Sequence, residues 1–143
     1  MEGLITKREL STVTAEIRML TEQAGALVLD YAVEIGRRLT EARGLVEHGS
    51  WEEYLGEIGY KKSTANNFMR VFREYGDPQG SLFGASCKSE ALGKLTYSKA
   101  LELLALPEEE REPFAAEVDA EHISTRELKE AIRQRDEARA ELE

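Results

Sequence analysis

Residues 51–73, WEEYLGEIGYKKSTANNFMRVFR, constrain the fold more than any other part of this sequence. Apolar residues recur at helical spacing on both sides of Gly59: Tyr54, Leu55 and Ile58 before it, then Tyr60, Ala65, Phe68 and Phe72 after it. This spacing predicts two short helices that turn at the glycine and bury one face each in a shared core. The predicted arrangement is that of a helix-turn-helix.

The side chains left on the outer face of the second predicted helix suit contact with DNA. Amides, hydroxyls and cationic groups bond to phosphates and to the edges of bases. The candidate DNA-binding residues are Lys61, Lys62, Ser63, Thr64, Asn66, Asn67, Arg70 and Arg73. The amides are candidates to read adenine, Arg70 is expected at a phosphate or a guanine, and Lys61 to Thr64 are expected at phosphates and the groove edge. The alternative is a helical hairpin whose outer face is merely polar.

The charge distribution qualifies this hypothesis. The chain has 143 residues and a net charge of −9, which argues against coating nucleic acid through bulk electrostatics. Most of the acidity lies in residues 106–143, which hold 13 acidic against 6 basic residues. Residues 59–73, in contrast, contain four cationic residues and no acidic one. The predicted reading helix is therefore locally basic, and we expect a homodimer to bind double-stranded DNA more effectively than a lone module.

A single long amphipathic helix is predicted over residues 11–43, where apolar residues recur every three or four positions. Gly25 and Gly36 weaken it, by about 1 kcal/mol each relative to alanine. Gly36 could instead mark a close approach between helices. The apolar stripe could face the core of the chain or a second copy, and the sequence leaves both possibilities open.

The complete chain is predicted to be all-α, in three parts. Residues 1–75 form the long helix and the helix-turn-helix, residues 76–94 a linker rich in glycine and serine, and residues 95–143 an acidic helical subdomain that ends in an extended helix. Helix starts are predicted at Ser50 with Glu53 in a capping box, at Ser63, at Thr96, and at Ser124 with Glu127 in a second box. Leu82 and Phe83 of the linker are expected to dock onto a neighbouring surface.

Residues 34–70, EIGRRLTEARGLVEHGSWEEYLGEIGYKKSTANNFMR, followed by YGDPQGSLFG and LTYSKALELLALPEEERE, resemble the domain-of-unknown-function family numbered 3102. The resemblance covers about residues 20–135, and the Gly-Ser-Trp and Leu-Pro-Glu-Glu-Glu-Arg segments are its most specific parts. Members of that family occur in phages and in integrative or conjugative elements of Gram-positive bacteria. The resemblance implies a mobile genetic element as the context and supplies no activity.

The order GKLTYSKALELLAL, then ISTRELKEAI, is similar to the region of partition-type ParB proteins that follows their helix-turn-helix. In those proteins a Leu-Ser-x-x-His-Ala-Arg-Ala-Leu helix precedes a Leu-Ser-Val-Arg helix. Lys99 stands here in place of the histidine, and Glu102 in place of the arginine. The nucleotide-binding part of that family has no counterpart in the sequence, so the likeness implies a helical DNA-binding core and neither CTP hydrolysis nor clamp loading.

Other function classes find little support in the residues. His48 and His122 have no nucleophile or metal ligand at a recognisable spacing, so we expect neither an enzyme nor a cofactor or metal site. The single cysteine, Cys87, cannot form an internal disulfide, and no segment has the length of a membrane span, which favours a cytoplasmic protein. The alternative function is an acidic helical interaction module, or a DNA mimic, that binds a basic protein through its C-terminal helices.

Overall fold

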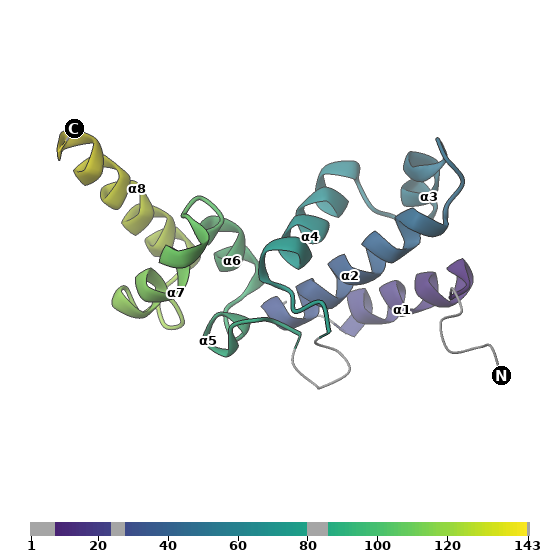
Figure 1. The fold of residues 1–143 in the computed structure, drawn as a ribbon, viewed down its shortest axis with the longest axis horizontal. Helices are drawn as coiled ribbons and strands as arrows, with labels where there is room; N and C mark the ends of the chain where they lie inside the picture. The colour runs from purple at the N-terminus through teal and green to yellow at the C-terminus, as the bar shows by residue number, and fades with distance from the viewer. Residues whose placement is uncertain (1–7, 24–27, 80–85, 143) are drawn as a thin grey trace.

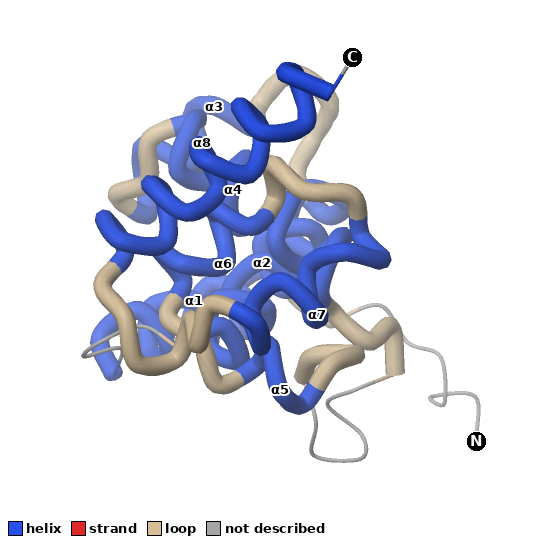
Figure 2. The backbone as a smooth tube through the Cα atoms, turned by 90° about the vertical axis from the view of Figure 1, so that its left-hand side faces the viewer, coloured by secondary structure: helices blue, strands red, loops and turns tan. Residues whose placement is uncertain are grey.

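The structure, a computed structural model, describes residues 8–23, 28–79 and 86–142. Within these ranges the chain forms helices and no strand, only two isolated bridges, Val28 to Thr96 and Gly76 to Cys87 (Figure 2). The predicted all-α class is therefore confirmed. The helices are α1 (Leu10–Gln23), α2 (Leu29–Leu45), α3 (Trp51–Ile58), α4 (Lys62–Tyr75), α5 (Glu90–Gly93), α6 (Tyr97–Leu103), α7 (Glu108–Glu117) and α8 (Thr125–Leu142).

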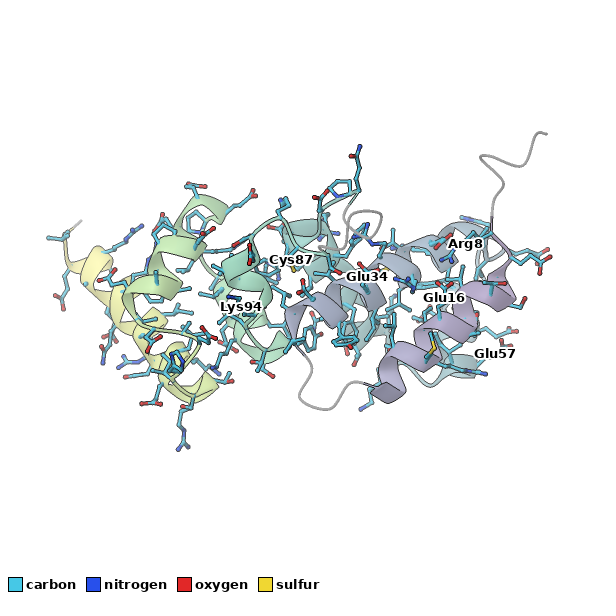
Figure 3. All side chains as sticks on the ribbon, turned by 90° about the horizontal axis from the view of Figure 1, so that it is seen from below. Arg8, Glu16, Glu34, Glu57, Cys87 and Lys94 are labelled. Carbon is cyan, nitrogen blue, oxygen red and sulfur yellow. The ribbon has the colours of Figure 1, made fainter. Side chains whose placement is uncertain are left out.

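The prediction of one long N-terminal helix over residues 11–43 is wrong, because two helices, α1 and α2, cover this range and lie side by side (Figure 1). Ion pairs join them: Arg8 lies 2.7 Å from Glu16 and 2.5 Å from Glu41, and Arg38 lies 2.8 Å from Glu16 (Figure 3). Residues 24–27, between the two helices, lie outside the described residues. Two packed helices share the same apolar spacing as one continuous helix, so the spacing did not reveal the break.

α4 packs against α2 at Gly36, which confirms the predicted close approach of helices at this glycine. A Cβ atom at Gly36 would lie 2.0 Å from the carbonyl oxygen of Phe68 and 2.8 Å from the Cβ of Phe72. Only glycine therefore allows the two backbones to come this close. The largest fully buried side chains of the core are Ile17, Leu29, Ile35, Leu39, Leu55, Leu103, Leu106, Leu128, Val13, Val33 and Val71.

The C-terminal helices brace α4 through aromatic side chains. The ring of Phe68 on α4 stacks on that of Tyr97 on α6, with centroids 4.5 Å apart and planes 6° from parallel. The hydroxyl of Tyr75, at the end of α4, donates a 2.6 Å hydrogen bond to the carbonyl oxygen of Ala100. These contacts fix the position of α4 relative to α6.

A buried arginine on α7 adds a second connection to α4. Arg111 is 5% exposed, and its Nε donates to the carbonyl oxygens of Leu103 and Leu106, near the end of α6. Its Nη1 lies 3.0 Å from Glu74 of α4, as an ion pair without the alignment of a hydrogen bond. The guanidinium thus ties α7 to the carbonyl oxygens at and just after the end of α6, where that of Leu103 also accepts from the amide of Leu106.

Of the predicted caps, those at Thr96 and Ser124 are confirmed, and the Thr96 hydroxyl accepts from the Lys99 amide at 3.3 Å. The Ser124 amide donates to Glu127 at 2.9 Å, and the Glu127 amide donates to the Ser124 hydroxyl at 3.0 Å. Ser50 precedes α3 without a side-chain cap. Ser63 lies inside α4, whose N-cap is Lys61. The predicted linker contains the short helix α5. Leu82 and Phe83 of the linker, which were expected to dock onto a neighbouring surface, lie outside the described residues.

Candidate nucleic-acid interface

The outward face of α4 owes its position to the turn before it. Gly59 ends α3 with φ 84°, a left-handed conformation that glycine adopts without the steric cost of a Cβ. The following amide, of Tyr60, donates to the carbonyl oxygen of Leu55 at 2.9 Å. Leu55, where Ala or Gly is usual in a helix-turn-helix, is 1% exposed and lies in the core. The two helices predicted around Gly59 are thus present.

Nearly all the side chains predicted to contact DNA are exposed. Thr64 is half-buried, and the exposed ones are Lys61, Lys62, Ser63, Asn66, Asn67, Arg70 and Arg73. The opposite face of α4 is buried through Ala65, Phe68, Met69, Val71 and Tyr75. α4 and its N-cap residue Lys61 therefore present all of the predicted set except Thr64 fully to solvent, and the function of that set stays a prediction.

Few carboxylates neutralise this face. Lys62 lies 3.8 Å from Glu52 of α3, but both side chains are more than half exposed, and such a pair contributes little. No described carboxylate forms an ion pair with Lys61, Arg70 or Arg73. In Figure 1 α8, the last helix of the acidic C-terminal region, lies at the far end of the molecule, beyond α6, and does not cover α4.

A groove of about 580 Å³ runs between α2 and α4, along the basic face. Its lining residues are Thr40, Arg43, Asn66, Asn67, Met69, Arg70, Phe72, Arg73, Gly76 and Pro78, and no carboxylate is among them. Thr40 and Arg43 belong to α2 and were not singled out from the sequence. Only the packing of α2 beside α4 brings them to the predicted residues, and we find no signal in the local sequence that could have identified them.

Three titratable side chains of the described C-terminal part are either paired locally or buried. The Nζ of Lys99 donates to the carbonyl oxygen of Glu121 at 3.2 Å, and His122 lies 2.9 Å from Asp119. Burial raises the pKa of the Cys87 thiol far above its ordinary value. Within the described ranges, no three His, Cys, Asp or Glu side chains are placed to hold a metal ion, and no helix is long and apolar enough to cross a membrane.

Comparison with known proteins shows the family and no more. No curated protein and no solved structure matches the chain. A family model described as "Protein of unknown function (DUF3102)" matches residues 8–135, which include all the helices except the last turns of α8. The match extends over most of the chain, and this protein therefore belongs to the DUF3102 family.

Proposed function

We propose that this protein binds double-stranded DNA through the exposed face of α4, with α3, the turn at Gly59 and α4 acting as a helix-turn-helix. In this proposal it is an accessory or regulatory protein of a mobile genetic element, such as a phage or a conjugative element, and acts as a homodimer. It is a binding protein without catalytic activity of its own.

The observation that carries the proposal is the segregation of charge on α4. Lys61, Lys62, Arg70 and Arg73 are exposed, and residues 59–73 contain no acidic side chain. A chain of net charge −9 that keeps one helix face free of carboxylates has a local surface that attracts phosphates. Hydroxyl and amide groups between these cations supply the hydrogen-bonding capacity that a purely electrostatic surface lacks.

The residues divide into two roles. Lys61 and Lys62, at the start of α4, contact phosphates and position the helix. Asn66 and Asn67 face the base edges, where an amide bonds adenine through both N6 and N7, and Arg70 contacts a phosphate or a guanine. Replacing Asn66 or Arg70 at a base contact should cost about 1–3 kcal/mol at one base position, whereas replacing Lys62 should weaken binding to all sequences alike.

A dimer would double the number of contacts that one α4 can make. Met19 of α1 and Tyr31 of α2 are large apolar side chains that remain 51% and 42% exposed, so α1 and α2 offer one surface for a second copy. Leu142, 88% exposed at the end of α8, offers another. Sedimentation of the purified chain, with and without a two-fold-symmetric duplex, tests whether a dimer forms.

The direct experiment is selection of bound duplexes from a random-sequence pool at low and at moderate salt. We expect an enriched sequence. Lys62→Ala should weaken binding to all sequences alike, and Asn66→Ala should weaken binding through one base position. If both variants bind duplex DNA like the wild type, with the same salt dependence, the assignment of α4 as the interface is wrong.

The alternative function, an acidic module or DNA mimic for a basic protein, has one feature in its favour, the acidic composition of residues 106–143. Several of these carboxylates already have partners within the chain. Glu110 pairs with Arg135 and Arg139, and Glu130 and Glu137 both pair with Arg133. α8 itself carries five acidic and five basic residues, so it presents no net negative charge to a basic partner, and we rank this function second. Capture of a basic partner that depends on these carboxylates, without any retention of DNA at low salt, would favour it.

A further inference from the structure

The arginines of α2 differ in what they contact. Arg37 donates to the carbonyl oxygens of Asp77 and Pro78 and lies over the ring of Phe72, 4.8 Å from its centroid. Arg38 forms ion pairs with Glu16 of α1 and Glu34 of α2. Arg43, in the last turn of α2, pairs with no described carboxylate. The central carbon of its guanidinium lies 6.0 Å from the centroid of the Trp51 ring. That distance is at the outer limit of a cation–π interaction, so the guanidinium is only weakly held.

Arg43 shares the α2–α4 groove with two further unpaired arginines. Arg70 and Arg73 come from α4, so cations stand on both walls. The groove also has Met69 and Phe72 among its lining residues, and apolar walls of low dielectric constant concentrate the field of the charges around them. Three exposed guanidinium groups line one groove, and a bound anion could accept hydrogen bonds from several of them.

We infer that the α2–α4 groove is a seat for a backbone phosphate of DNA, held between Arg43 of α2 and the arginines of α4. The inference rests on the proposed function and adds a contact from a different helix. Guanidinium groups suit phosphate oxygens because their planar N–H donors match the spacing of those oxygens. At about 580 Å³ the groove is larger than one phosphate and leaves room for the attached sugars.

A phosphate held from both helices would set how α4 lies on the duplex. α2 and α4 are rigidly joined at Gly36, so a contact from Arg43 constrains the orientation of α4 as well as adding affinity. Contacts of this kind carry no sequence information of their own but fix the register in which the base-reading side chains work. Arg43 is thus a positioning residue for the proposed reading residues, Asn66 and Asn67.

The test is the salt dependence of binding by the full-length chain. We would measure the affinity of wild type, Arg43→Gln and Arg126→Gln for a short random-sequence duplex by fluorescence anisotropy, over a range of salt concentrations. Arg126 is an exposed arginine of α8, remote from the groove, and serves as the matched control. Loss of one phosphate contact should lower the slope of log K against log salt by about 0.9, and should weaken binding about fivefold near 0.15 M salt. Arg126→Gln should leave both unchanged.

The outcomes separate this inference from the proposed function. If the wild type binds the duplex and Arg43→Gln keeps the wild-type slope, the phosphate seat is wrong while the role of α4 stands. If Arg43→Gln lowers the slope while Lys62→Ala and Asn66→Ala have no effect, the seat stands and the roles assigned to Lys62 and Asn66 fail. If no duplex binds at low salt, the proposed function fails. A titration with pyrophosphate, followed through the arginine Nε–H resonances, then decides between a site for a small phosphoryl compound and no site, and either result overturns the DNA assignment.

Discussion

The close packing of α2 on α4 makes Gly36→Ala a sharp test of the fold that supports the basic face. The added Cβ would lie 2.0 Å from the carbonyl oxygen of Phe68, far inside van der Waals contact. Because the obstructing atom belongs to the backbone of a helix, no change of side-chain rotamer can relieve the overlap. α4 must move away from α2, and the core contacts between the two helices loosen.

Two opposing effects set the size of the loss. Overpacking a core costs about 1–3 kcal/mol, and a clash with a backbone atom belongs at the upper end of that range. Replacing glycine by alanine inside a helix contributes about 1 kcal/mol in the stabilising direction. We therefore expect Gly36→Ala to lower the free energy of unfolding by about 2 kcal/mol. With a slope near 2 kcal/mol per molar, the urea midpoint would fall by about 1 M.

Urea unfolding followed by circular dichroism measures this change, and Gly44→Ala provides the control on the same helix. Gly44 is exposed, and a Cβ there would meet no atom within 4 Å. The same substitution should therefore stabilise the protein at this position, by about 0.5 kcal/mol in the last turn of α2. A Gly36→Ala protein as stable as the wild type, or more stable, would refute the packing of α2 on α4.

Other substitutions test separate parts of the structure. Ser124→Ala should lower the free energy of unfolding by about 1 kcal/mol in urea, because it removes one half of the capping box, whereas Ser63→Ala should be nearly neutral because Ser63 caps nothing. Tyr97→Leu should cost about 1 kcal/mol in the same assay through loss of the stacking on Phe68, and equal stability would contradict the brace between α4 and α6. Hydrogen bonds from Arg8 lower the pKa of Glu16 and Glu41 below 4.5, so their stabilisation is full above pH 4.5 and is lost as the pH falls through the folded-state values. Acid titration of Arg8→Gln should accordingly show a smaller loss of stability than wild type, and an equal loss would count against the ion pairs. The buried Cys87 thiol should resist a thiol reagent near pH 8 until urea unfolds the protein, and rapid reaction of the native protein would contradict its burial.

Local patterns in the sequence were enough to predict the pair of helices around Gly59 and the exposed set on α4. The apolar residues and the polar residues of α4 occupy opposite faces of a single helix, so no knowledge of the remaining chain was needed. The capping box at Ser124 is likewise a local feature, since both partners lie within four residues. Each of these predictions depended on residues close together in the chain.

Apart from the close approach at Gly36, features that depend on how distant segments pack were predicted wrongly or missed. The break between α1 and α2 is hidden because the apolar spacing continues from one helix to the other. Ser63 has the residue type of a cap, but α4 begins two residues earlier than predicted, with Lys61 as its N-cap. Arg43 joins the basic face only because α2 lies against α4, a contact that Gly36 permits and that no local pattern specifies.

Mapping a short duplex onto the labelled protein by NMR, at about 50 mM salt, tests the central claim most directly. The account predicts that the resonances which shift are those of residues 61–73, together with the side chain of Arg43, and that added salt reverses the shifts. Shifts confined to α8, or no shifts anywhere, would contradict it.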